Sequence, residues 1–203
     1  MKPLVSLVAL CGLACATARP VAQEASNYPT VLTPPSQHPG EFLRRQRLVA
    51  RYMGQTMAFD AVLQKKGDVL TLIGLTPFGA KAFALVQTGV DVKFTPFLMR
   101  ETPFPPENIM KDIYRTYFLG ISEGVLPDGL QTAYRDGERI QEVWAGGRLQ
   151  ERRFMRLVSG RRGEIVVTYV GGMADGKSPA QIEFHNGWFG YDLSISTVSE
   201  EAL

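Results

Sequence analysis

The sequence predicts a mainly β protein, in which a large curved antiparallel sheet forms a half-barrel that an amphipathic helix covers. Three observations lead to this fold class. From Phe42 onward, apolar and polar residues alternate with a period of two, as in strands with one buried face. Short turns rich in Gly separate these runs, and strands joined by such short connections pair antiparallel. After Pro105-Pro106, one segment changes to the period of a helix.

The first half of the body contains several predicted strands in succession. Residues 57–64 alternate strictly, whereas residues 69–74 are apolar on both faces, which indicates a strand covered on both sides. The hairpin signal at residues 65–68 and the turn at residues 88–89 leave no room for a crossover. We therefore expect antiparallel strands at residues 57–64, 69–74, 81–85 and 90–94.

A single clear helix is predicted from Pro105 to Phe118. The two prolines suit its first turn, and Glu107 complements the positive end of the helix dipole. Charged residues lie opposite a wide apolar side, which we expect to pack on the sheet. This apolar side comprises Ile109, Met110, Ile113, Tyr114, Tyr117 and Phe118, and the opposite side carries Lys111, Asp112 and Arg115.

The second half returns to strands. An Asn186-Gly187 pair predicts a two-residue hairpin between the last two of them. Between Arg148 and Arg162, six arginines accompany Glu151 alone, which indicates an exposed face or edge of the sheet; the alternative is a surface that steers an anionic head group. Strands are expected at residues 130–134, 140–144, 165–170, 182–184 and 189–196.

A sheet of this size is expected to curl, and a helix inserted midway is placed to cover its open side. Such an architecture makes an apolar cavity. The same inward apolar residues would equally fill a solid core, and the two alternatives stay open. The candidate cavity residues are Phe59, Leu72, Phe83, Ile113, Tyr117, Trp144 and Phe184, and Trp188 is a further candidate for an apolar interior.

The N-terminal region predicts export. Residues 1–18 have a short positive start and an uncharged apolar stretch of signal-peptide length. Cleavage before Cys15 would make a lipoprotein with Cys15 as its lipid anchor, and ordinary cleavage after Ala18 is the alternative. Cys11 fits a lipobox less well, and no cysteine follows Cys15. Residues 19–40 predict a flexible Pro-rich tether, and residues 41–203 a single domain.

The composition excludes several functions. A net charge of +2, without a basic tail, argues against a nucleic-acid partner. Glu183 and His185 share one face of a strand and are a candidate acid–base or metal pair, but surface residues of this kind are more often structural. The other histidine, His38, lies in the predicted tether, and no ligand spacing typical of a metal site occurs. We therefore expect neither catalysis, cofactor nor metal.

The turn Leu75-Thr76-Pro77-Phe78-Gly79 places a Phe where a polar residue is usual. Phe78 is either tucked under the sheet or exposed at the tip, where an apolar side chain indicates contact with lipid or an apolar partner. Together with the signal and the strand-like runs at residues 48–52, 57–64 and 70–75, this turn resembles the DUF3261 lipoproteins. That family is similar to the LolA/LolB carriers of lipoproteins.

The resemblance, which covers roughly residues 42–118, implies a half-barrel that holds acyl chains under a helical lid. It implies that Pro77 and Phe78 form a loop facing membrane or cargo. The expected function is a lipid-anchored (palmitate-type), non-enzymatic carrier on the periplasmic face of the outer membrane, holding acyl or polyene-like chains. The expected partners are lipid or lipoprotein acyl chains, the membrane surface and a periplasmic carrier protein. The alternative is an inert scaffold or assembly protein of the cell envelope.

Overall fold

The computed structural model describes residues 28–98, 105–122, 124–156, 163–174 and 177–203. Within these residues, one α-helix, α2 (Pro106–Tyr117), and a short 3₁₀ helix, η1 (Pro35–Gln37), accompany a large set of strands. The strands are β1 (Phe42–Tyr52), β2 (Gln55–Lys66), β3 (Val69–Leu75), β4 (Lys81–Thr88), β5 (Asp91–Pro96), β6 (Gly129–Arg135), β7 (Glu138–Ala145), β8 (Arg148–Arg156), β9 (Glu164–Met173), β10 (Gln181–Asn186) and β11 (Tyr191–Ala202).

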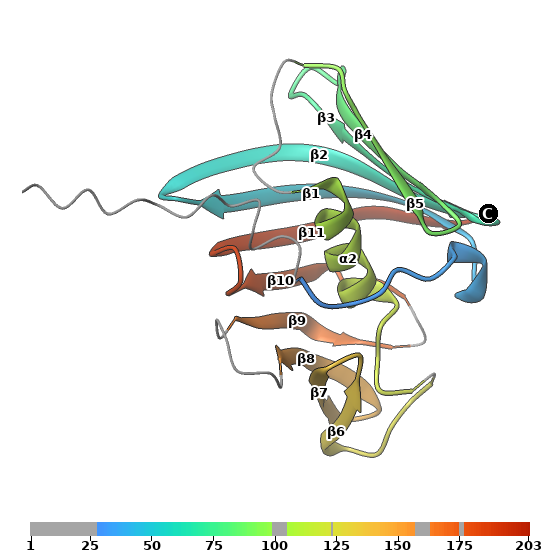
Figure 1. Ribbon diagram of the computed structural model, residues 1–203, viewed down its shortest axis with the longest axis vertical. Coiled ribbons are helices and arrows are strands. Elements are labelled where there is room, and N and C mark those ends of the chain that lie inside the picture. The colour runs from blue at the N-terminus through green and yellow to red at the C-terminus, as the bar shows by residue number, and fades with distance from the viewer. Residues whose placement is uncertain (1–27, 99–104, 123, 157–162, 175–176) are drawn as a thin grey trace, which may run out of the picture.

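All 11 strands belong to one sheet with the order β5-β4-β3-β2-β1-β11-β10-β9-β8-β7-β6. Every neighbouring pair is antiparallel, and the pairing of β1 with β11 joins the two halves of the chain in the middle of the sheet. β5 and β6 form the two edges, so the sheet curves strongly but stays open (Figure 1). The predicted fold class, a large curved antiparallel sheet covered by a helix, is confirmed.

Tight reversals connect most of the strands. Asp136 and Gly137 have φ angles of 51° and 77°, and Gly146 and Gly147 have φ angles of 60° and 67°. Two successive residues in this left-handed region form the turn whose twist matches that of the flanking strands, and glycine adopts it without a steric penalty. These turns set the register of β6–β7 and β7–β8.

The hairpin between β10 and β11 differs from its prediction. Asn186 pairs with Tyr191, so four residues rather than two form the loop. The Asn186 Oδ1 atom accepts hydrogen bonds from the backbone N–H groups of Trp188 and Phe189, both at 3.0 Å. The Asn186 carbonyl accepts a third from Gly190 at 2.8 Å. Since the Asn side chain replaces missing backbone partners, it stabilises the longer loop.

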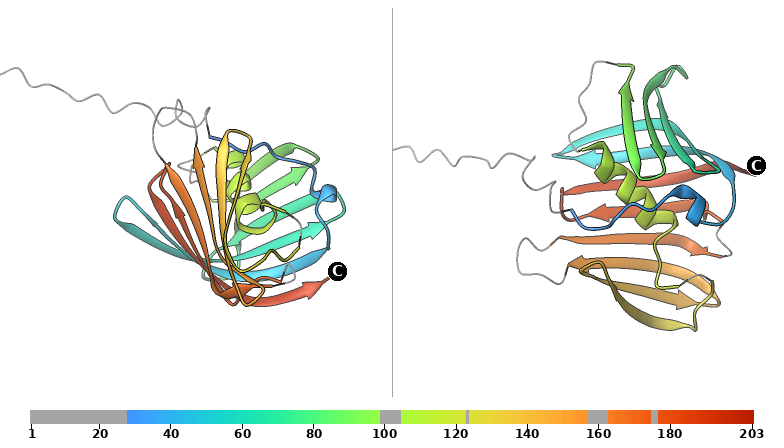
Figure 2. Two further views of the ribbon diagram at one scale, coloured as in Figure 1. Left: turned by 90° about the horizontal axis from the view of Figure 1, so that it is seen from below. Right: turned by 45° about the vertical axis from the view of Figure 1, so that its right-hand side comes forward.

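The helix α2 lies against the concave face of the sheet, and the sheet curves around it (Figure 2). It begins at Pro106, as the two prolines predict, with Pro105 in the extended conformation before it. Glu107 is its single exposed residue. The helix is therefore enclosed by the half-barrel rather than laid across its rim.

Residues 28–40 differ from the expected flexible tether. They run along the concave face beside α2 and lead through η1 into β1 (Figure 2). Tyr28, Thr30 and Leu32 are 4%, 7% and 6% exposed. This segment has no sequence periodicity because its buried residues contact the helix and the sheet individually. The rest of the predicted tether and the signal, residues 1–27, lie outside the described residues.

Candidate functional site

Two charged residues of α2, Asp112 and Arg115, face into the molecule, contrary to the expected orientation. Asp112 and Arg115 are 7% and 0% exposed. Ile109 and Ile113, which belong to the apolar side of the helix, are only half-buried. Burying charged groups is costly unless they are paired and hydrogen-bonded. The surroundings of these two charges therefore determine how the helix is held.

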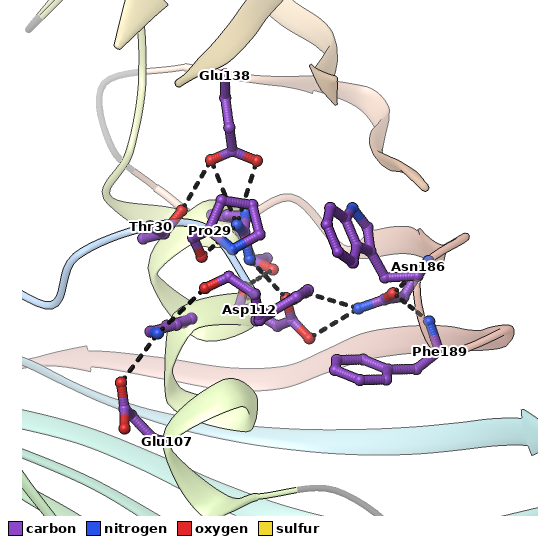
Figure 3. Close-up of polar contacts among 12 residues, drawn as sticks. Pro29, Thr30, Glu107, Asp112, Glu138, Asn186 and Phe189 are labelled. Carbon is purple, nitrogen blue, oxygen red and sulfur yellow. Dashed lines mark hydrogen bonds and ion pairs between the residues drawn. The ribbon is translucent and has the colours of Figure 1, made fainter. Parts of the chain in front are cut away.

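Asp112 is the centre of a buried polar cluster. Its carboxylate accepts hydrogen bonds from the hydroxyls of Tyr28 and Tyr191 and from Asn186 Nδ2, the last at 3.1 Å. Figure 3 shows Asn186 of β10 directed at Asp112 from the β10–β11 hairpin. Burial raises the pKa of Asp112 above its ordinary value, while the Arg115 guanidinium and the hydroxyl donors oppose this shift. The cluster ties residue 28, the middle of α2 and the β10–β11 hairpin together.

Arg115 extends the cluster toward β7. Its Nη2 atom donates to the Pro29 carbonyl at 2.8 Å and to both carboxylate oxygens of Glu138 at 3.3 Å, and its Nη1 atom donates to Asp112 at 3.2 Å (Figure 3). Thr30 donates to Glu138 at 3.0 Å. These contacts hold α2 and residues 28–30 together against the sheet. Such a helix is a fixed part of the interior, not a loosely attached lid.

A second buried ion pair lies beside the C-terminal end of α2. Arg152 Nε donates to Glu142 Oε1 at 2.7 Å, and Arg152 Nη1 donates to the Arg115 carbonyl at 3.1 Å. Glu142 also accepts a hydrogen bond from Trp144 Nε1 at 3.0 Å. Tyr169 donates to the Thr116 carbonyl at 2.7 Å, and burial raises the pKa of Tyr169 to about 12. Arg152 and Tyr169 thus satisfy carbonyl groups at the end of the helix, where backbone acceptors lack partners within the helix.

A cavity of about 810 Å³ adjoins this second pair. Exposed residues in its wall, among them Gly124 and Ala202, show that it opens to solvent. It lies between the end of α2, the start of β1, the end of β11 and the strands β7–β9. Its larger apolar wall residues are Phe42, Tyr117, Phe118, Val125, Trp144, Leu149 and Met173.

Charged residues also line the cavity. Arg44 donates to Glu200 at 2.9 Å, and its guanidinium lies 3.9 Å from the centre of the Phe42 ring. Arg152 contributes a second guanidinium, and Lys177 and Glu41 are exposed members of the wall. The cavity therefore combines an apolar floor with buried guanidinium groups and a polar rim, a composition suited to an amphiphilic molecule.

The structure separates the predicted cavity residues into three groups. Tyr117 and Trp144 line the cavity. Leu72 and Phe184 are 7% and 3% exposed and belong to the core. The others, Phe59, Phe83 and Ile113, are half-buried and pack against the core; Trp188, the further candidate, is buried in it.

Sequence reasoning missed the charged residues of the interior. In β7, Glu138, Ile140, Glu142 and Trp144 alternate with outward-facing residues, so the two acids share the buried face with two apolar residues. Arg152 is buried in the inner strand β8, between β7 and β9, where an exposed face or edge was expected. Acidic residues in phase with apolar ones are the signal that would have identified these positions.

Phe78 is 97% exposed. Its turn is closed by a hydrogen bond from Gly79 N to the Thr76 carbonyl at 2.9 Å, and Gly79 has a φ of 79°. At the same end of the sheet, the backbone N–H groups of Phe97 and Leu98 both donate to the Ala82 carbonyl. Phe97 and Leu98 are 51% and 49% exposed. The open alternative for Phe78 is therefore decided in favour of the exposed side chain.

The candidate acid–base pair lies on the convex face. His185 contacts Asp192 Oδ1 at 2.7 Å, and Glu183 accepts hydrogen bonds from Ser194 and Gln181. Among the described residues, no group of three or more His, Cys, Asp or Glu side chains is arranged to hold a metal ion. The predicted anchor, Cys15, lies outside the described residues. Within the described part of the chain, no helix combines the length and apolarity needed to cross a bilayer.

The fold class is thus an open antiparallel half-barrel with a helix against its concave face. The family model DUF3261, described as a protein of unknown function, matches residues 43–199. The chain belongs to this family, which confirms the resemblance seen in the turn and the strands that precede it. No curated protein shows significant sequence similarity to the chain.

Two solved structures are weakly similar to the chain over most of its length. One is a domain described as an outer membrane lipoprotein-sorting protein from Vibrio parahaemolyticus, with 12% identity, 90% of each chain covered and a TM-score of 0.47. The other is a LolA superfamily protein from Nitrosomonas europaea, with 12% identity, coverage of 88% of this chain and 90% of that chain, and a TM-score of 0.45. TM-scores below 0.5 carry nothing about function.

Proposed function

We propose that this protein is a non-enzymatic carrier of acyl-type amphiphiles in the bacterial cell envelope. The observation that carries this proposal is the cavity of about 810 Å³ beside α2, with its apolar floor and polar rim. Cavities of about 300–1,000 Å³ with a few placed polar groups are typical of sites for small molecules. Binding and release of such a molecule require burial of apolar surface and no covalent chemistry.

The energetics favour a chain-like ligand. Each methylene moved from water into an apolar site contributes about 0.8 kcal/mol. A chain with about ten methylenes in the cavity would gain roughly 8 kcal/mol of transfer free energy, part of which offsets the freedom lost on association. Trp144, Leu149 and Phe118 supply the apolar surface for this contact.

We propose that the protein is held at the outer membrane by a lipid anchor on Cys15. Pro77 and Phe78 then contact the membrane or the cargo. The nearly complete exposure of Phe78, near the half-exposed Phe97 and Leu98, supports a surface that meets an apolar environment. A periplasmic carrier protein is a further proposed partner.

Native mass spectrometry of the full chain purified from its own membrane tests the carrier. We expect a co-purified lipid-like mass that is absent in Ser122→Trp, because Ser122 is an exposed small residue in the cavity wall and an indole there would occupy the cavity. The matched control is Ser196→Trp, an exposed serine on β11 outside the cavity. A bare mass for the unmodified protein would refute the carrier.

A specific observation favours a second candidate, an inert scaffold. The helix and residues 28–40 occupy much of the concave face and are held there by buried hydrogen bonds. A scaffold of this kind needs a rigid, filled interior and no ligand. Co-purified lipid that Ser122→Trp removes, but Ser196→Trp retains, would exclude this alternative.

A further inference from the structure

Arg152 has a donor group for which no described residue provides an acceptor. A guanidinium carries five N–H donors in a fixed fork. The Nε atom of Arg152 donates to Glu142 at 2.7 Å, and Nη1 donates to the Arg115 carbonyl at 3.1 Å and to the Tyr169 hydroxyl at 3.3 Å. Nη2 makes no hydrogen bond with any described residue, although Arg152 is only 5% exposed.

This free Nη2 group faces the cavity. Arg152 is one of the residues that line it, and Nη2 is not among the occluded side-chain atoms that lack a hydrogen bond in the described part of the chain. Because the cavity opens to solvent, water or the polar head of a ligand can accept from this donor. The hydrogen bonds of Nε and Nη1 fix the guanidinium in place, so Nη2 has a defined direction.

Gly120 packs closely against the guanidinium of Arg152. A Cβ atom at this position would lie 2.8 Å from Arg152 Nη2 and 3.0 Å from Glu142 Oε1. The backbone of Gly120 does not have the left-handed conformation that favours glycine, so its own geometry does not explain the residue. Gly120 lines the same cavity. The absence of a side chain therefore lets the backbone of Gly120 pack directly against the Arg152–Glu142 pair at the wall of the cavity.

The surroundings combine this donor with apolar surface. Trp144, Leu149 and Phe118 lie in the wall of the same cavity. Arg44 and Lys177 add positive charge to the wall, and Glu41 and Glu200 add negative charge. Glu200 accepts a hydrogen bond from Arg44 at 2.9 Å, and Glu142 outside the wall accepts one from Arg152.

We propose that the cavity-facing side of Arg152 Nη2 forms a subsite for the carboxylate head of a single-chain amphiphile, with the chain on the apolar wall. This inference rests on the proposed carrier function and names its ligand class. A guanidinium binds a carboxylate oxygen more strongly than a neutral ester oxygen, because the opposite charges add to the hydrogen bond. The subsite therefore selects a free fatty-acid type ligand over the corresponding ester.

The test compares palmitate with methyl palmitate, which have the same chain, in titrations with the full-length protein. We expect palmitate to bind about tenfold more tightly than the ester, as a charge-assisted hydrogen bond provides. Gly120→Ala should remove this preference, because the added methyl group blocks Nη2 while the charge stays. Arg152→Lys should do the same, because an ammonium group can pair with Glu142 but has no fork to extend into the cavity.

The matched control is Arg153→Lys, at the neighbouring position on the opposite face of β8, where Arg153 pairs with Glu164. It should leave the preference for palmitate unchanged. A preference that persists in folded Gly120→Ala would overturn the subsite, even if Arg152→Lys fails to fold. Equal affinities of the unmodified protein for acid and ester would also overturn the subsite and leave the carrier intact, whereas no binding of either chain would refute the carrier itself.

Discussion

Two buried arginine–glutamate pairs flank the end of α2, and they differ in what surrounds them. The side chains of Arg115 and Glu138 are 0% and 4% exposed, and those of Arg152 and Glu142 are 6% and 1% exposed. The Nε atom of Arg115 makes no hydrogen bond but is occluded, whereas the spare Nη2 of Arg152 is not. The same chemistry thus fixes a helix in one place and presents a donor in the other. Adjacent empty space, rather than charge or burial, makes the difference.

Of the substitutions at the two pairs, Arg115→Leu is expected to reduce stability most. The substitution leaves Asp112 and Glu138 buried without their cation, so we expect the free energy of unfolding to fall by about 3–5 kcal/mol. Urea denaturation measures this change. Glu107→Gln is the control, since the exposed Glu107 forms an i,i+4 pair with Lys111 that is worth about 0.5 kcal/mol or less. Equal losses of stability in Arg115→Leu and Glu107→Gln would contradict the role of Arg115 as the buried cation of Asp112 and Glu138.

Asp112→Asn is expected to change the pH dependence of stability. Because the folded-state pKa of Asp112 lies above the ordinary 3.8, the unfolded chain releases this proton first as the pH rises. The wild type should therefore lose stability relative to Asp112→Asn between pH 3.8 and the folded-state pKa, and the difference should then level off. Denaturation curves at several pH values measure it. A wild type that gains relative stability over this range would show that Arg115 lowers the pKa instead.

A smaller effect is expected from Arg152→Lys. Glu142 keeps a cationic partner, while the hydrogen bonds of Nη1 to the Arg115 carbonyl and Tyr169 are lost. We expect a loss of about 1–2 kcal/mol in the free energy of unfolding, measured by urea denaturation. The same change at Arg115, which does not line the cavity, should cost more. A smaller loss of stability in Arg115→Lys than in Arg152→Lys would contradict the proposed difference between the two arginine–glutamate pairs.

The smallest effect on stability is expected from Phe78→Glu. Phe78 is 97% exposed, so the change should alter the free energy of unfolding by no more than about 0.5 kcal/mol. It should nevertheless weaken binding of the protein to lipid vesicles in a co-flotation assay, because a charged tip does not enter an apolar layer. Thr132→Glu, on the edge strand β6, is an exposed control. Unchanged flotation of Phe78→Glu would remove the membrane role of this turn.

The elements could be predicted well because their signals are local. The period of two located most of the strands, and Pro105-Pro106 located the start of α2. The four-residue loop after Asn186 was missed because its side chain, rather than its backbone, provides the acceptors. The sequence predicted a tether for residues 28–40 because the hydrogen-bond partners of Tyr28, Asp112 and Asn186, lie far along the chain and leave no local pattern.

The site could be predicted only in part. Tyr117 and Trp144 belong to the cavity, since inward apolar residues are expected in any curved sheet. Arg152 and Gly120 gave no such signal. In a sequence, an arginine in a strand is typical of the surface, and a glycine after a helix is typical of a helix end. Only the structure shows that Arg152 and Gly120 lie close together.

By itself, the sequence determined that this chain forms a curved antiparallel sheet with one helix, because alternation, turn residues and prolines act over a few neighbouring positions. For Phe78 the sequence left two alternatives, and the structure decided in favour of the exposed side chain. Only the tertiary structure decided that Asp112 and Arg115 point inward and that a cavity remains beside Arg152. These features depend on pairings between segments far apart in the chain, such as Asn186 with Asp112 and Arg152 with the end of α2.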